Sequence, residues 1–206
     1  MTRFCARIYS RHENRQLKRV KMTKTALAYR ELGAKRFRET FGLCYEDFEI
    51  GDVFEHRPGR TITEEHRPGN TVTDVDNILL TLLTMNIQPV FVDEAFATNT
   101  EWKQRLIDST LTVALLTAMS VRTVGANVAA NLGWDKVKAT HPVFVGDTLY
   151  TESTVLSKRE SVSQPTQGIV TVSTRGLNQD GKEVMNFERS MLIYKRRHSP
   201  EAAAEN

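Results

Sequence analysis

The sequence predicts an α+β protein in which an antiparallel sheet encloses one long helix. Helical patterns dominate up to residue 125, and four segments with strand character, separated by turn signals, follow from residue 136 onward. The most apolar stretch, 109–121, lies between Asp108 and Arg122 and is apolar on most of its faces. Other structure must therefore surround this stretch, and a curved sheet is the simplest cover.

Composition limits the function classes. With 206 residues, 40% of them apolar, the chain suits a single domain with a sizeable core. The net charge of +3 is uneven, because residues 1–24 hold eight Lys/Arg and one Glu and the remaining residues carry −4. A slightly acidic body argues against nucleic acid as a partner. Cys5 and Cys44 cannot build a disulfide framework or a thiolate metal cluster, which indicates a reducing compartment, the cytoplasm.

Three regions are expected along the chain. Residues 1–24 form a basic leader, interpreted as disordered or as the result of a misplaced start codon, with Met22 as an alternative start. An organellar targeting segment is the other interpretation of this leader. Residues 25–197 contain no long linker and form one domain, and residues 198–206 are expected to be a disordered tail. No stretch is long and apolar enough to span a membrane, so no membrane partner is expected.

The elements are expected in this order. Helices are predicted over 26–38, 74–86, 95–106 and 109–125, and Pro89 ends the second of them. Asp108 and Ser109 are the capping residues of the fourth helix, and Gly125 closes it. Strands are predicted over 136–140, 148–158, 168–178 and 183–195.

A decamer occurs twice in succession: EHRPGRTITE (55–64) and EHRPGNTVTD (65–74), with seven of ten positions identical. Each copy joins a Pro-Gly turn signal to β-branched alternation. Because ten is even, a shift by one copy keeps every side chain on the same face of a sheet. Either copy could occupy one strand position while the other loops out. The alternative is a paired basic binding loop that uses Arg57 and Arg67.

Common catalytic motifs are absent from the sequence. It has no Gly-rich phosphate loop, no GxSxG, no HExxH and no His/Asp/Glu cluster with metal-ligand spacing, so neither a metal nor a cofactor is expected. His141 is the plausible site histidine, although a residue at a strand end near the surface is the commoner role for such a position.

Several ordered segments together resemble one family. They are GRTITE (59–64), LTLLTMNIQPVFVDEAFA (80–97) and HPVFVGDTLYTESTVLSKRES (141–161). From about Tyr45 to Arg197 the chain resembles the MaoC-like hydratases and dehydratases, in particular the branch that acts on mesaconyl-CoA, β-methylmalyl-CoA or itaconyl-CoA. The resemblance implies a hotdog fold, a homodimer or larger homo-oligomer, and coenzyme A as part of the substrate. It implies a lyase that adds water to, or removes it from, a short branched or dicarboxylic enoyl-CoA.

The resemblance also implies the site. The family motif D-x-N-P-x-H matches residues 86–91, which places Asn86 at the first position and Phe91 at the position of the family histidine. A phenyl ring cannot transfer protons, so Asp108, Asp93 or His141 would have to replace that histidine. Backbone N–H groups at Ser109 would stabilise the enolate oxygen. The expected substrate-binding residues are Gln88, Pro89, Val90, Asp93, Arg57 and Arg67.

Two other functions stay open. Phe91 favours a non-catalytic hotdog subunit that binds acyl-CoA or an active homologue. A thioesterase on the same fold would need a base near the helix start, for which Asp108 is the evident candidate. Lys136 is a further candidate for contacts with the anionic coenzyme.

Overall fold

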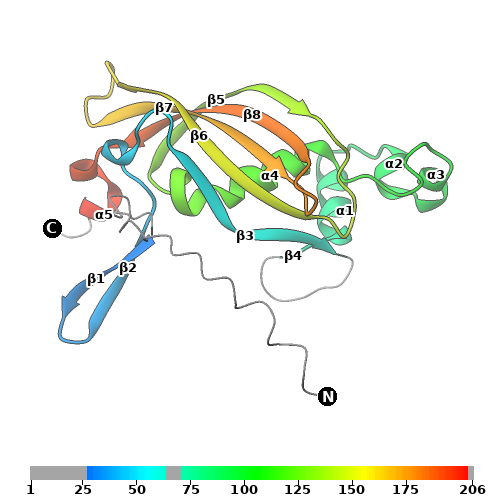
Figure 1. The fold of residues 1–206 in the computed structure, drawn as a ribbon, viewed down its shortest axis with the longest axis horizontal. Coiled ribbons are helices and arrows are strands. Elements are labelled where there is room, and N and C mark those ends of the chain that lie inside the picture. Colours follow the sequence, from blue (N-terminus) through cyan, green and yellow to red (C-terminus); the bar gives the residue numbers. More distant parts are fainter. Residues whose placement is uncertain (1–26, 64–70, 204–206) are drawn as a thin grey trace, which may run out of the picture.

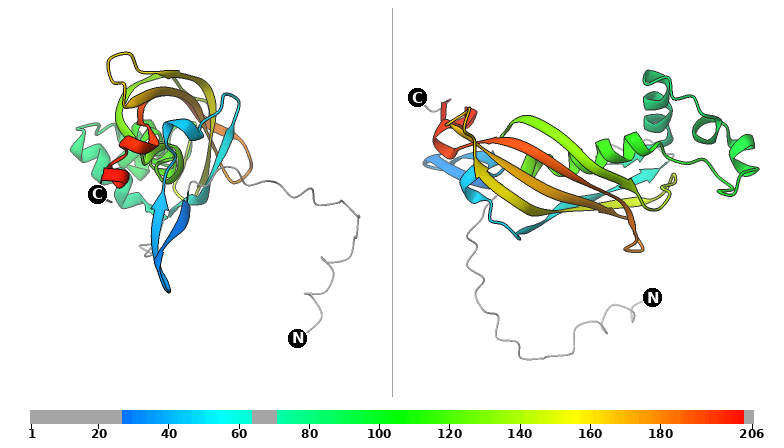
Figure 2. Two further views of the ribbon diagram at one scale, coloured as in Figure 1. Left: turned by 90° about the vertical axis from the view of Figure 1, so that its left-hand side faces the viewer. Right: turned by 90° about the horizontal axis from the view of Figure 1, so that it is seen from above.

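A six-stranded sheet curls around one helix and forms the body of the molecule (Figures 1 and 2). The computed structural model describes residues 27–63 and 71–203. The strand order is β4-β3-β6-β7-β8-β5, with β3 and β4 parallel and the other neighbours antiparallel. The strands are β3 (Val53–Thr63), β4 (Thr71–Thr73), β5 (Val128–Ala139), β6 (Thr148–Glu160), β7 (Gln167–Leu177) and β8 (Glu183–Tyr194). Helix α4 (Ser109–Met119) lies inside the curl, which confirms the predicted α+β class and the sheet around a helix.

The sheet encloses α4 because three long strands alternate in sequence between buried and half-buried side chains. On β8, for example, Met185, Phe187, Met191 and Ile193 all turn inward. Helix α4 packs against these strands through Leu111, Leu115 and Leu116, which are all buried. The approach of α4 to β7 depends on Gly176, where a Cβ atom would lie 2.5 Å from Leu116 Cδ1.

The core consists of two apolar clusters with a polar layer between them. The first cluster contains Leu111, Leu116, Leu149 and Phe187, and the second contains Phe48, Val155, Val172 and Met191. Along β6 and β8 the residues between the clusters are polar and buried, and the layer comprises His56, Ser120, Ser153, Thr174 and Arg189. Since buried polar groups are costly unless they are hydrogen-bonded, the contacts within this layer matter for stability.

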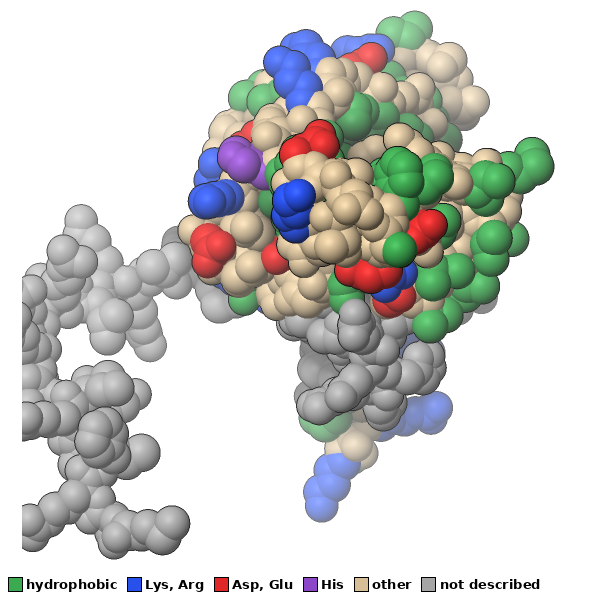
Figure 3. Space-filling model, turned by 90° about the vertical axis from the view of Figure 1, so that its right-hand side faces the viewer, with side chains coloured by type: hydrophobic (Ala, Val, Ile, Leu, Met, Phe, Trp, Pro, Cys, Tyr) green, Lys and Arg blue, Asp and Glu red, His purple; other side chains and the backbone are tan. Residues whose placement is uncertain are grey.

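Three short helices lie at one end of the sheet: α1 (Asp74–Leu83), α2 (Pro89–Val92) and α3 (Glu94–Thr98). Hydrophobic side chains of α1 remain exposed, namely Val75, Leu79, Leu82 and Leu83. Figure 3 views the molecule from this end and shows hydrophobic side chains gathered along one side of the face. Among the described residues, none of the helices has the length and apolar character that crossing a membrane requires.

At the other end, a hairpin of β1 (Leu27–Gly33) and β2 (Arg36–Phe41) projects from the body (Figure 1). The helix predicted over 26–38 is therefore wrong. Gly33 interrupts the helical pattern, Ala34 and Lys35 form the turn, and the alternation of Arg36, Phe37 and Arg38 has a strand period.

Other predicted boundaries also change. The helix predicted over 95–106 ends at Thr98, and the predicted helix 109–125 ends at Met119. A π turn, η2 (Val121–Gly125), follows because the N–H groups of Thr123, Val124 and Gly125 all converge on the Ser120 carbonyl. The 3-10 turn η1 (Tyr45–Asp47) precedes β3. The predicted disordered tail contains the end of η3 (Arg196–His198) and the short helix α5 (Pro200–Ala203).

The two decamers lie side by side where both are described. The first copy lies in β3, and the Thr-Val-Thr of the second copy forms β4. Thr61 is opposite Thr71, Ile62 opposite Val72 and Thr63 opposite Thr73. Equivalent positions of the two copies are thus paired in parallel, ten residues apart. The interpretation that one copy loops out of the sheet is wrong for these three residues, and residues 64–70 lie outside the described part of the chain.

Candidate active site

Asp108 connects two predicted site residues at the start of α4. One of its carboxylate oxygens accepts the Thr110 N–H and the Thr110 hydroxyl, both at 2.7 Å, and the other accepts the Asn86 side-chain amide at 2.7 Å. The Asp108 side chain is fully buried. Asn86 and Asp108 therefore meet, as a helix cap braced by an amide. A buried carboxylate with three donors is well suited to holding the helix start.

Asn77 of α1 positions the chain around this cap, and the sequence analysis missed it. Its amide donates to the carbonyls of Phe91 (3.2 Å) and Leu106 (3.3 Å), and its carbonyl accepts the Asp108 N–H at 2.9 Å. One fully buried side chain thus connects α1, the segment at Phe91 and the start of α4. The available signal was a polar residue within the apolar pattern of α1.

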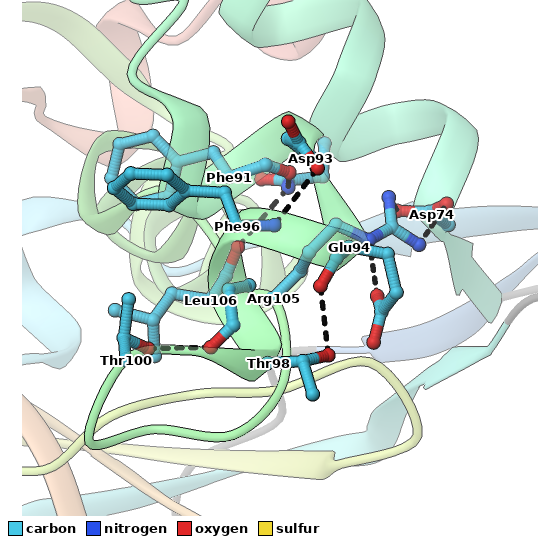
Figure 4. Close-up of polar contacts among 11 residues, drawn as sticks. Asp74, Phe91, Asp93, Glu94, Phe96, Thr98, Thr100, Arg105 and Leu106 are labelled. Carbon is cyan, nitrogen blue, oxygen red and sulfur yellow. Dashed lines mark hydrogen bonds and ion pairs between the residues drawn. The ribbon is translucent and has the colours of Figure 1, made fainter.

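Arg105 supports the same region from its outer side (Figure 4). Its guanidinium binds both oxygens of Asp74 at 2.9 and 2.8 Å, and its Nε donates to Glu94 at 2.8 Å. Burial lowers the pKa of Arg105, but the hydrogen bonds that it donates to Asp74 and Glu94 outweigh this effect, so the pKa rises overall. This network fixes α3 and the start of α1 to the segment that leads into α4.

A pocket of about 320 Å³ lies beside the start of α4. Its walls come from the segment 91–109 and from the segment 139–143, which begins at the last residue of β5. Its lining includes Phe91, Ser109, Thr140 and His141. The pocket is mainly apolar and is small for a ligand site, which suits a short acyl chain.

The predicted site residues divide into two groups. Phe91 and Ser109 line the pocket, whereas the cap pair Asn86–Asp108 does not. Gln88 precedes α2, Pro89 is its first residue, and Val90 is buried with its carbonyl accepting the Leu106 N–H at 3.1 Å. All three thus shape the segment that carries Phe91.

The remaining predicted residues have other contacts. Asp93 caps α3 by accepting the Phe96 N–H at 2.9 Å (Figure 4). Arg57 pairs with Glu55 at 3.2 Å and lies over the ring of Tyr150, and neither Arg57 nor Asp93 lines the pocket. Lys136 forms an exposed ion pair with Glu188. Arg67 lies outside the described residues.

His56, which the sequence analysis left in the decamer, is fully buried in the polar layer. Its Nε2 lies 2.9 Å from the Ser153 hydroxyl and its Nδ1 lies 2.7 Å from the Thr123 hydroxyl. Burial, with a smaller contribution from the charge of Arg189, lowers the pKa of His56 to about 4. Burial lowers the pKa of Arg189 to about 10, and its guanidinium donates to the Ser120 hydroxyl at 2.9 Å. The period-two pattern of β3, with Phe54 and His56 turned inward, was the available signal.

Metal ligands are not clustered in this region. Within residues 27–63 and 71–203, no group of three His, Cys, Asp or Glu side chains is arranged to hold a metal ion.

The comparisons with known proteins identify the family. The model of the MaoC like domain matches residues 47–176, more than half of the chain. The chain belongs to the MaoC-like family. It is 30% identical over 155 residues to mesaconyl-CoA hydratase of Cereibacter sphaeroides and 31% identical over 155 residues to beta-methylmalyl-CoA dehydratase of Chloroflexus aurantiacus. These matches cover 75% of this chain and 42% and 41% of the two relatives, so the chain spans less than half of their length.

Solved structures give the same assignment of fold. A putative MaoC domain dehydratase from Chloroflexus aurantiacus is 29% identical, with a TM-score of 0.67 over 77% of this chain and 42% of that chain. A Mycobacterium tuberculosis protein described as having a double hotdog fold is 20% identical, with a TM-score of 0.59 over 76% of this chain and 46% of that one. The hotdog fold implied by the sequence is thus confirmed.

Proposed function

We propose that this MaoC-like chain adds water to, or removes it from, a short branched or dicarboxylic enoyl-CoA such as mesaconyl-CoA. The observation that carries the proposal is the small apolar pocket at the start of α4, in a chain of a family of hydratases and dehydratases. The names of the two relatives, a mesaconyl-CoA hydratase and a beta-methylmalyl-CoA dehydratase, support a five-carbon branched acyl group. A pocket of about 320 Å³ suits that acyl group and leaves the coenzyme outside.

Hydration needs a stabilised enolate oxygen. The N–H of Ser109, first in α4, has no acceptor within the helix, and the positive end of the helix dipole is directed to the same place. A thioester carbonyl placed there would gain stabilisation as negative charge develops on its oxygen. Asp108 and Asn86 keep this helix start in position from behind.

Phe91 is the feature that makes the activity worth testing directly. It lines the pocket at the position that the resemblance assigns to the family histidine. A phenylalanine at this position favours a second candidate function, that of a non-catalytic subunit that binds acyl-CoA. A thioesterase that uses Asp108 is less well supported, because the carboxylate is buried and already accepts three hydrogen bonds.

One experiment separates the three functions. Purified protein is incubated with mesaconyl-, itaconyl- and crotonyl-CoA while the enoyl thioester absorbance and free thiol are followed together. Loss of absorbance without thiol supports the hydratase, and thiol release supports the thioesterase. Binding without either signal supports the non-catalytic subunit. If wild type is inert on all three substrates, the hydratase proposal fails, and activity of Phe91→His would then support the non-catalytic subunit.

The expected homodimer belongs to the same proposal. Strand β5 ends the sheet, and its exposed side chains include the hydrophobic residues Leu132, Trp134 and Val137. A second copy that pairs along this edge would cover them in a symmetric interface. The double hotdog neighbour supports a second domain of the same fold as the occupant. Sedimentation velocity of wild type and Val137→Lys tests this: a dimer for the former and a shift toward monomer for the latter.

A further inference from the structure

The pocket beside α4 contains a histidine that lies outside the segment 86–91, which matches the family motif. Of the described residues that line the pocket, His141 is the one with a side chain that can serve as both acid and base in a reaction, since the others are apolar or aromatic side chains and the hydroxyls of Ser109 and Thr140. It lines the same pocket as Phe91, fifty residues earlier in the chain. His141 is exposed, so water and small molecules reach its ring.

Hydrogen bonding selects one tautomer of His141. Its Nδ1 lies 2.7 Å from the backbone carbonyl oxygen of Glu183, the first residue of β8. A carbonyl oxygen only accepts, so Nδ1 carries the proton and Nε2 of the neutral ring has a free lone pair. An imidazole in this state can act as a base through Nε2.

The ring is also held in position. The backbone N–H groups of Thr140 and His141 both donate to the Val184 carbonyl, at 2.9 and 3.3 Å, and the Thr140 hydroxyl donates to the Glu183 carbonyl. The segment is thus fixed to the start of β8 by backbone and side-chain bonds. A base with a fixed orientation loses less on binding a reactant than a mobile one does.

We propose that His141 is the acid–base residue of this pocket, an inference that rests on the proposed hydratase function. Nε2 removes a proton from water as the water oxygen bonds to Cβ, and the Cα=Cβ electron pair moves onto the thioester to form an enolate. The Ser109 N–H donates to the enolate oxygen. The imidazolium then returns a proton to Cα, the carbonyl re-forms, and His141 is neutral again. Dehydration runs through the same steps in reverse.

This assignment explains how Phe91 is compatible with catalysis. The proton-transfer group comes from the segment after β5 instead of from the segment after α1, and Phe91 becomes part of the apolar wall. An apolar wall suits the methyl or methylene carbons of a branched acyl group.

The test uses the full chain and the enoyl-CoA that wild type turns over fastest. His141→Ala is expected to lower kcat by about 10²- to 10⁴-fold, the usual contribution of a general acid–base group. Because the position is exposed, free imidazole should restore part of the rate in His141→Ala and leave wild type unchanged. His198→Ala, an exposed histidine outside this pocket, is the matched control and should keep the wild-type rate.

The outcomes separate the two proposals. An active wild type with an unimpaired His141→Ala overturns the role of His141 and leaves the hydratase function standing. A loss of activity that imidazole does not restore also overturns the role, and circular dichroism then shows whether folding is the cause. A wild type that is inert on every enoyl-CoA overturns the hydratase function itself, and the role of His141 with it.

Discussion

His56 should make the stability of this protein fall at mildly acidic pH. The buried imidazole has a pKa of about 4 in the folded state, whereas an unfolded chain has the ordinary value of 6.5. Below pH 6.5, therefore, His56 is protonated in the unfolded state but stays neutral in the folded state. The unfolded state gains free energy from this proton until the pH reaches about 4. The difference of roughly 2.5 pKa units corresponds to about 3 kcal/mol of folding free energy, lost as the pH falls from about 6.5 to about 4.

The measurement is the free energy of unfolding in urea between pH 8 and pH 4.5, at one protein concentration. His56→Gln keeps a side chain that can bond to both Ser153 and Thr123 but cannot titrate. The carboxylates titrate equally in both proteins, so the difference between wild type and His56→Gln isolates the imidazole. That difference should change with a slope of about 1.2 kcal/mol per pH unit near pH 5.5. His198→Gln, at an exposed position, should run parallel to wild type.

Parallel curves for wild type and His56→Gln would refute the argument. They would mean that the folded protein accepts the proton, so that the polar layer between the two apolar clusters is open to water or can rearrange around an imidazolium.

Three further changes test the fold. Deleting residues 55–64 should keep the structure and a single cooperative thermal transition, because the second decamer then follows Phe54 in the same alternation. Deleting nine residues instead should unfold the protein, since it turns the β3 side chains to the other face. Arg105→Met should cost about 2 kcal/mol in urea unfolding, because it leaves Asp74 and Glu94 unpaired, while the exposed pair partner Arg175→Met should cost under about 1 kcal/mol. Leu116→Ala should lower the unfolding free energy by about 2–5 kcal/mol and the exposed Leu83→Ala by under about 0.5 kcal/mol.

Most of the secondary structure could be predicted from local sequence patterns. Strands β6, β7 and β8 and the start of α4 at Ser109 were predictable, because period-two alternation, turn residues and a capping aspartate are all local signals. The strand predicted over 136–140 was wrong in its start, since β5 spans Val128–Ala139. The hairpin over 27–41 was missed since a run of good helix formers hides the strand pattern that begins at Arg36. The end of α4 at Met119 was missed because it depends on Ser120, whose hydroxyl accepts a bond from Arg189 on a strand far along the chain.

The site was harder to predict because its parts meet only in three dimensions. Asn86 and Asp108 were chosen separately, and nothing in the sequence shows that they bind each other. Asn77 gives no motif signal, although its three hydrogen bonds fix the segment at Phe91. His56 and His66 look equivalent in the two decamers, and burial of the first depends on which strand position its copy takes.

The hydrogen bonds that the Asp108 carboxylate accepts limit which group can act as the base for a reaction in the pocket. A carboxylate that accepts bonds from Thr110 and Asn86 inside the fold is not free to activate water, so the proton must move through His141 whether the bond attacked is in the alkene or in the thioester. The Ser109 N–H would stabilise an enolate and a tetrahedral oxyanion equally well. Hydration and hydrolysis then differ in one geometric respect, namely which carbon lies within reach of water held by Nε2 of His141. A thioester oxygen bound at Ser109 places its carbonyl carbon nearest the helix and Cβ two bonds farther away. Since Ser109 and His141 line the same pocket from different elements, hydration requires Nε2 to lie within reach of Cβ, whereas hydrolysis requires it to lie within reach of the carbonyl carbon.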